Sequence, residues 1–166
     1  VSAWRISDGT VTTTGTWTNA NSMIVLIYSG THATTPVGAS VTDTGGSGTT
    51  ISYGALAFSV TDGTSWAAMV GGTVSVDVSI VDPPSGTTFR DGEVDANDGI
   101  AGFDSNAGVA GWSLQTVGGQ GNAAWRSLVF EIIAAAGGGE PPAPEAGNRK
   151  FVRRRRQRMR ARKPTI

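Results

Sequence analysis

Oxygen-bearing side chains are concentrated in residues 91–99, which read DGEVDANDG. Glu93, Asp95 and Asn97 stand at alternate positions, and Asp104 follows eleven residues after Glu93. Such a spacing of oxygen ligands resembles a calcium-binding loop. However, Asp98 stands where the sharp turn of such a loop needs glycine, and a glutamate replaces the usual first aspartate. We therefore expect a solvated acidic connection, with a Ca²⁺ site as the alternative. The candidate ligands are Glu93, Asp95, Asn97 and Asp104.

Aromatic side chains offer a second kind of chemistry, because a tryptophan ring can form a stacking platform for a sugar. The chain has five tryptophans, each in or beside a segment with strand character, where core packing is the commoner role. Trp112 is the candidate for glycan binding, because glycines at 108 and 111 flank it and a short loop precedes it.

Catalysis has little support in the sequence. His32 is the single histidine, in the Thr-rich stretch GTHATTP, with no nucleophile motif nearby. Two carboxylates can cleave a glycoside, but among so many aspartates some pair will always be close, so their abundance is uninformative. The absence of cysteine excludes disulfides, thiolate metal sites and a cysteine nucleophile. We expect a protein that is not an enzyme and that has no cofactor unless Ca²⁺ binds.

The basic residues are gathered at one end of the chain. Ten of the thirteen Lys and Arg residues lie within 149–166. Such an arm suits a polyanionic partner, which is either nucleic acid, through its phosphates, or an acidic groove on a neighbouring protein; a solvated tail that binds polyanions non-specifically is the simpler alternative. The cations are Arg149, Lys150, Arg153, Arg154, Arg155, Arg156, Arg158, Arg160, Arg162 and Lys163.

The overall neutrality of the chain is a cancellation between two parts. Residues 1–139 hold three arginines against eleven carboxylates, a net charge of −8, whereas residues 140–166 hold ten cations against two glutamates, a net charge of +8. We expect a domain over 1–136, a Gly/Pro-rich linker over 137–148 and an Arg-rich arm over 149–166. The twelve linker residues span up to roughly 40 Å when extended, and the arm has the composition to become helical once its charge is neutralised.

Short apolar or alternating segments separated by Gly, Pro and Asp turn signals recur along residues 1–136, and this pattern favours β-structure. We predict an all-β fold, a single jelly-roll-like β-sandwich of about 8–10 strands. The predicted segments are 3–6, 11–18, 23–29, 49–53, 55–60, 66–70, 74–81, 100–103, 109–117 and 125–133.

Three of these segments allow a prediction about faces. The alternation VSVDVSIV over 74–81 predicts one buried face, and MIVLIY over 23–28 predicts a central strand covered on both sides. In the last segment, Leu128, Phe130 and Ile132 share a face, with Glu131 on the other. No run of apolar residues approaches the length of a membrane span and the start does not resemble a signal peptide, so we expect a soluble protein.

Several segments resemble the jelly-roll or β-sandwich domains of tailed-bacteriophage virion proteins. They are GTWTNANSMIVLIYSG (15–30), SWAAMVGG (65–72), DPPSGTTFR (82–90), AGFDSNAGVAGWS (101–113) and AAWRSLVFEI (123–132). The resemblance covers about residues 1–135 and does not include the basic arm. It implies a structural role at the particle surface, in capsid decoration, a fibre or a tail tip, with other virion proteins as partners and often a trimeric state.

From these observations we expect a virion structural protein anchored by its arm. The alternatives are a carbohydrate- or receptor-binding module and an accessory protein that contacts nucleic acid through the arm.

Overall fold

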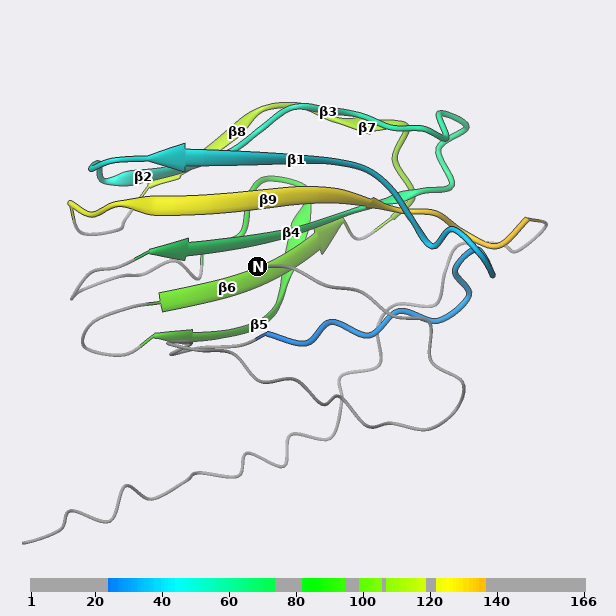
Figure 1. Cartoon of the computed structure of the whole chain (residues 1–166), viewed down its shortest axis with the longest axis horizontal. Helices are drawn as coiled ribbons and strands as arrows, with labels where there is room; N and C mark the ends of the chain where they lie inside the picture. The colour runs from blue at the N-terminus through cyan, green and yellow to red at the C-terminus, as the bar shows by residue number, and fades with distance from the viewer. Residues whose placement is uncertain (1–23, 74–81, 95–98, 106, 119–121, 137–166) are drawn as a thin grey trace, which may run out of the picture.

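The computed structural model describes residues 24–73, 82–94, 99–105, 107–118 and 122–136. Within these ranges the chain forms nine β-strands and no helix (Figure 1). The all-β class predicted from the sequence is therefore confirmed. The strands are β1 (Val37–Gly45), β2 (Thr50–Tyr53), β3 (Leu56–Ala57), β4 (Trp66–Thr73), β5 (Thr87–Val94), β6 (Gly99–Ser105), β7 (Gly111–Trp112), β8 (Gln115–Gly118) and β9 (Trp125–Ile132).

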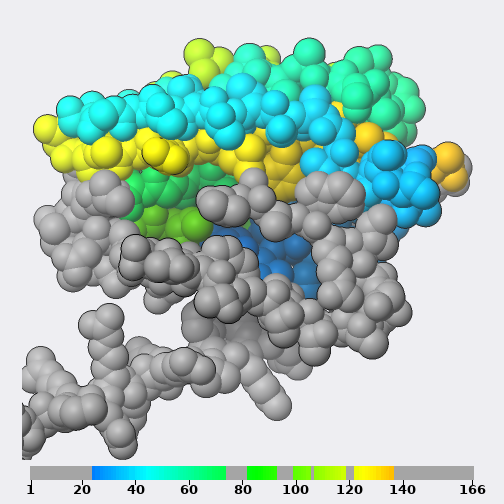
Figure 2. Space-filling view, viewed as in Figure 1, coloured from blue at the N-terminus to red at the C-terminus, as the bar shows by residue number. Residues whose placement is uncertain are grey.

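Five strands form one antiparallel sheet in the order β1-β9-β4-β6-β5. The last strand in sequence, β9, thus lies between the first and the fourth, and Figure 2 shows β1 and β9 as adjacent bands across the face of the molecule. The remaining strands form two antiparallel pairs, β2 with β8 and β3 with β7, and Figure 1 shows both pairs as a second layer beside β1 and β9.

The main core lies between the large sheet and this second layer. Tyr53 of β2 contacts Phe103 of β6 edge to face, with ring centroids 6.0 Å apart, and Met69 and Val129 from the central strands are fully buried beside them. Consecutive residues of a strand point to opposite faces of the sheet. In β4, side chains on both faces are buried. The main core cluster comprises Ile51, Tyr53, Leu56, Phe58, Ala67, Met69, Ala101, Phe103, Trp112 and Val129.

A second, smaller cluster occupies the opposite face of the large sheet. Trp66, Ala68 and Ile132 are buried there, and Tyr28 and Phe130 pack against them. The large sheet is therefore covered by apolar side chains on both faces. This explains why β4 reads WAAMVGGT, an almost continuous apolar run, and not a simple alternation.

Four predicted segments are confirmed as strands with small shifts of their ends: β2, β4, β6 and β9. The segment 55–60 contains only the two-residue β3, and 109–117 divides into β7 and the start of β8. The sequence reasoning missed β1 and β5, whose polar residues and glycines resemble loop composition. The predicted segments 3–6, 11–18 and 74–81 lie outside the described residues.

The prediction of a central strand at 23–29 is wrong for the residues described. Residues 24–28 belong to no strand. Their exposure alternates: Ile24, Leu26 and Tyr28 are half-buried, whereas Val25 is 44% and Ile27 68% exposed. Ile24, Leu26 and Tyr28 lie against the outer face of the large sheet, and among the described residues this is the side of the segment that packs.

Gly71 of β4 marks a close approach between the sheet and the second layer. A Cβ at this position would collide with the hydroxyl oxygen of Tyr53, whereas a Cβ at the neighbouring Gly72 would meet nothing nearer than the carbonyl oxygen of Gly99 at 3.5 Å. The two glycines point to opposite faces of one strand. The Tyr53 hydroxyl can therefore approach β4 this closely only because residue 71 has no side chain.

We predict that Gly71→Ala lowers the free energy of unfolding by about 1–3 kcal/mol, because the added methyl group overpacks the core. Gly72→Ala is the matched control, and it should be neutral or stabilising by up to about 1 kcal/mol, since alanine costs less backbone entropy than glycine. Urea unfolding of both variants measures the difference. Equal losses in the two variants would show that the contact with Tyr53 is unimportant.

Candidate functional site

Two carboxylates, Asp104 and Glu131, are each 0% exposed and are the chemically distinctive groups of the described body. A buried carboxylate is unstable unless it is neutralised or fully hydrogen-bonded. The two are stabilised in different ways.

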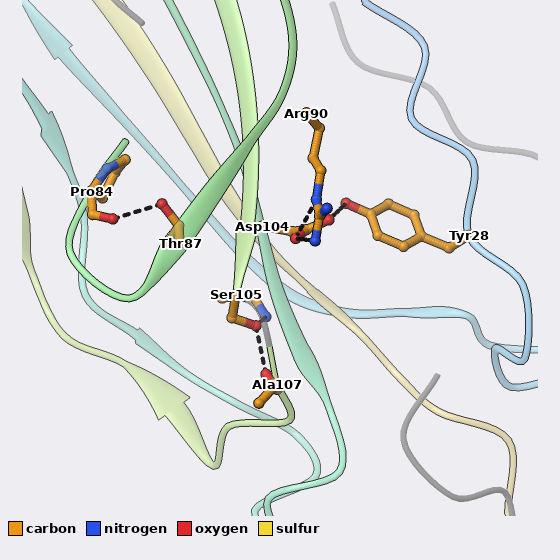
Figure 3. Close-up of polar contacts among 8 residues, drawn as sticks. Tyr28, Pro84, Thr87, Arg90, Asp104, Ser105 and Ala107 are labelled. Carbon is orange, nitrogen blue, oxygen red and sulfur yellow. Dashed lines mark hydrogen bonds and ion pairs between the residues drawn. The ribbon is translucent and has the colours of Figure 1, made fainter. Parts of the chain in front are cut away.

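Asp104 on β6 is paired with a counter-charge. Its Oδ1 lies 2.8 Å from Nε and 2.6 Å from Nη2 of Arg90 on β5. The hydroxyl of Tyr28 donates to Oδ2 at 3.2 Å. Figure 3 shows Arg90 and Tyr28 both directed at this carboxylate, from different elements of the fold.

Strand alternation in β5 accounts for the position of Arg90. Asp104 is opposite Thr88, and Arg90 stands two residues after Thr88, so its side chain is on the face of the sheet that carries Asp104. Phe89 is opposite Phe103 and Asp91 is opposite Gly102, so Arg90 is also the extra residue of a β-bulge.

Burial changes the pKa values of Asp104 and of the Tyr28 hydroxyl. Burial raises the pKa of Asp104, and the hydrogen bond and charge of Arg90 oppose this shift. Burial also raises the pKa of the Tyr28 hydroxyl, as does the neighbouring charge of Asp104. Tyr28 therefore remains protonated and donates to Asp104. This hydrogen bond links residues 24–28 to β6 of the large sheet.

Glu131 on β9 is held by neutral donors alone among the described residues. Its oxygen Oε2 accepts hydrogen bonds from the Ser59 hydroxyl at 2.6 Å, the Ser59 amide at 2.8 Å and the Ala39 amide at 3.0 Å. Its oxygen Oε1 accepts from the Ser65 hydroxyl at 2.8 Å and the Val60 amide at 3.0 Å. One carboxylate thus joins β1, the chain after β3 and the entry to β4.

The pKa of Glu131 and the position of Gly38 both show that the surrounding chain fits the Glu131 carboxylate closely. Burial acts to raise the pKa of Glu131, but the hydrogen bonds from Ser59, Ala39 and Val60 outweigh it, so that the pKa is lowered. A Cβ at residue 38 would collide with the carboxylate of Glu131 and come within 2.6 Å of the Ser59 hydroxyl oxygen. Gly38 is therefore required by the approach of the chain to Glu131.

The two carboxylates do not form a catalytic pair. Asp104 is opposite Ala68 in the ladder, and Glu131 is opposite Ala67. Because consecutive residues of β4 point to opposite faces, Asp104 and Glu131 lie on opposite sides of the large sheet. They cannot act on one glycosidic bond, and both serve to hold the fold together.

Asp104 is the candidate calcium ligand whose side chain the structure describes, and it is bound by Arg90 and Tyr28. In the backbone, Glu93 is opposite Ile100, and Asp104 lies four residues further along β6, a separation of about 13 Å at the rise of a strand. The side chain of Glu93, and the whole of Asp95 and Asn97, lie outside the described part of the chain. In the part of the chain that the structure describes, no three His, Asp or Glu side chains come together as a metal site would require.

Trp112, the candidate for glycan binding, is 9% exposed and belongs to the main core cluster. Its ring packs in the interior, which was the alternative interpretation, and its Nε1 has no hydrogen-bond partner. A buried ring offers no open face to a sugar, so Trp112 is corrected to a core residue.

His32 lies in a loop, residues 30–36, that is hydrogen-bonded to the residues following β9. Its Nδ1 accepts hydrogen bonds from the Thr35 hydroxyl at 2.9 Å and the Thr35 amide at 3.1 Å. Its amide donates to the carbonyl of Ile133 at 2.8 Å, and further backbone bonds join Pro36 to Ile133 and Gly30 to Ala135. His32 thus has a structural role in a turn, as expected for a loop histidine.

The ten cations of the arm, Arg149 to Lys163 in the sequence, lie outside the described residues, as does the linker 137–148. Within the described ranges, no helical segment has the length and hydropathy that crossing a membrane requires.

Sequence reasoning missed both buried polar clusters. A signal for Glu131 was present, because a single acidic residue stands within the apolar run LVFEII. Arg90 was also conspicuous as one of only three cations before residue 140. Their partners, Ser59, Ser65 and Tyr28, are distant in sequence, and only the strand order brings them together.

Comparisons of the chain with protein-family models, with curated proteins and with solved structures find no match. The functional argument therefore depends on the residues themselves.

We predict that Glu131→Gln lowers the free energy of unfolding at neutral pH by about 3 kcal/mol, because the amide NH₂ would face donors that the carboxylate satisfies. Asp91→Asn, at an exposed position, is the control for removing one negative charge and should change stability by less than about 0.5 kcal/mol. Urea unfolding measures both.

The same pair of variants has a predicted pH dependence. Since the folded protein lowers the pKa of Glu131 below its ordinary value of 4.5, ionisation of Glu131 stabilises the fold. This contribution is complete above the ordinary pKa and is lost as the pH falls through the lowered pKa. The stability difference between wild type and Glu131→Gln should narrow on acidification below that range, and a constant difference would contradict the assignment.

Proposed function

We propose that the chain is a non-enzymatic structural protein of a tailed-bacteriophage virion, a capsid decoration or fibre-type protein at the particle surface that its Arg-rich arm attaches to neighbouring subunits. The observation that carries the proposal is the division of charge. A body with a net charge of −8 is joined to a segment with a net charge of +8 through a linker rich in Gly and Pro.

The chemistry of the body supports a structural role. The two buried carboxylates of the described residues are each committed to internal contacts, Asp104 to Arg90 and Tyr28, and Glu131 to five donors. Such contacts rigidify a β-fold and leave neither group free for catalysis. The resemblance of several strand segments to virion β-sandwich domains agrees with this role.

The arm supports attachment. A chain segment that becomes ordered on binding can cover a large surface, and repeated copies on a symmetric particle add avidity. Arginine is suited to this role because its planar guanidinium binds carboxylate or phosphate through two parallel hydrogen bonds. We propose an acidic groove on a virion protein as the partner, with packaged nucleic acid as the alternative outcome of the tests below.

Attachment is tested by producing the chain in the phage-infected host and separating particles on a density gradient. The full chain should sediment with the particles. A variant with Arg153, Arg154, Arg155 and Arg156 replaced by glutamine should remain in the soluble fraction, whereas Arg126→Gln, which removes an exposed cation of the body, should still sediment. A full chain that stays soluble in the presence of particles would disprove the virion role.

The partner chemistry is tested by titrating the purified full chain with duplex DNA and with poly-glutamate at increasing salt. If six to ten arm cations contact phosphates, DNA affinity should fall by about 10³–10⁵ between 50 and 200 mM salt. The four-arginine variant should reduce the slope of log affinity against log salt by about 3–4. Stronger binding to poly-glutamate than to DNA at equal salt favours the acidic groove, and the reverse order favours the genome.

A further inference from the structure

Asp82 and Pro83 form the one Asp-Pro pair in the sequence, and the bond between them lies at the surface. Both residues are exposed, and neither belongs to a strand. They stand in the connection that leads into β5. Water and protons from the solvent therefore reach this peptide bond in the folded protein.

The residues after Pro83 form a tight turn into β5. The amide and the hydroxyl of Thr87 both donate to the carbonyl of Pro84, at 3.1 and 2.7 Å, and Figure 3 shows the hydroxyl contact. Gly86 has a φ of 79°, which suits the third position of such a turn. These contacts hold the chain after Pro83 to the fold and do not involve the Asp82–Pro83 bond.

The carboxyl group of Asp82 is not held by the fold. Within the described residues it makes no hydrogen bond or ion pair. The exposed Asp62, in contrast, accepts from the amide and the hydroxyl of Thr64 at 2.9 and 2.6 Å. Since no contact fixes its rotamer, the Asp82 side chain can turn toward the main-chain carbonyl of its own residue. A carboxylate in that position is a nucleophile for the carbonyl carbon.

Proline makes this bond easier to break than an ordinary peptide bond, because its nitrogen is a tertiary amide without a proton. Attack of the Asp82 carboxylate on the Asp82 carbonyl carbon forms a five-membered cyclic anhydride. The C–N bond breaks, and the nitrogen of Pro83 takes a proton from acidic solvent and leaves as a secondary amine. Water then opens the anhydride, which restores the side-chain carboxyl and leaves a new α-carboxyl on Asp82. The attack is intramolecular, so it is much faster than direct attack by water.

Cleavage after residue 82 would separate β1–β4 from β5–β9, and most strand pairing joins these two groups. In the large sheet, β9 pairs with both β1 and β4, and β4 also pairs with β6. In the second layer, β2 pairs with β8 and β3 with β7. Among the described ladders, only that of β5 with β6 lies within one group. The main core likewise joins Tyr53 of the first group to Phe103 of the second, edge to face.

We propose that the Asp82–Pro83 bond is a self-cleavage site, at which mild acid divides the folded protein into two chains, 1–82 and 83–166, that remain associated. The proposal is independent of the virion role, since it concerns the body alone. The arm stays attached to the chain that carries β5–β9.

Incubation of the purified full chain in mildly acidic buffer tests this proposal. Mass spectrometry of denatured samples should show two products, residues 1–82 and 83–166, whose summed mass exceeds that of the intact chain by one water. Size-exclusion chromatography without denaturant should show the cleaved protein at the position of the uncut chain. Wild type that gives no such products would overturn the cleavage, and products that separate without denaturant would overturn the association.

Two variants identify the chemistry. Asp82→Glu keeps the charge and the proline but requires a six-membered anhydride, and Pro83→Ala keeps the carboxylate but removes the tertiary amide. Each should slow cleavage at least about tenfold, and a thermal unfolding curve for each verifies that the fold is retained. The Asp62–Gly63 bond is the internal control and should stay intact, because no proline follows Asp62. An unchanged rate in Asp82→Glu, or equal cleavage after Asp62, would contradict the mechanism.

Discussion

The architecture depends on one buried carboxylate. Glu131 stands in β9, the strand between β1 and β4, and accepts five hydrogen bonds from residues at 39, 59, 60 and 65. These donors belong to segments that share no strand ladder with one another, so the carboxylate fixes the paths of connections that backbone pairing leaves undetermined. Gly38 shows the reciprocal constraint, because the chain can approach this closely only without a side chain.

The two buried carboxylates illustrate how a body with few cations satisfies its internal charges. Only three cations are available before residue 140, and Arg90 is committed to Asp104. Glu131 is satisfied by amides and serine hydroxyls, which are abundant in a chain rich in Ser, Thr and Gly. Several hydrogen bonds to an ionised group can replace a counter-ion, and the opposite shifts in the pKa values of Asp104 and Glu131 reflect these two solutions.

The sequence allowed the fold class and the most apolar strands to be predicted, because β4 is an almost continuous apolar run and β9 has apolar residues at alternate positions. It did not reveal β1, whose sequence VGASVTDTG has the composition of a loop and becomes a strand by pairing with β9 along Val37–Gly45. Residues 24–28 were predicted as a central strand but belong to no strand. An apolar run does not show whether a segment lies within a sheet or packs on its face. The site at Asp104 could not be predicted, since β5 was missed and only the register of β5 against β6 places Arg90 beside Asp104.

Three backbone hydrogen bonds between residues 30–36 and residues 133–135 determine how the fold would resist a pull on this end of the chain. Residues 133–136 connect β9 to the linker, so a pull on the chain beyond residue 136 would first load the backbone hydrogen bonds that join Gly30, His32 and Pro36 to residues 133–135. Those bonds would have to break before the force reached β9. Because β9 is bonded on both sides, to β1 and to β4, its removal from the sheet would then require the breaking of two ladders and not of one.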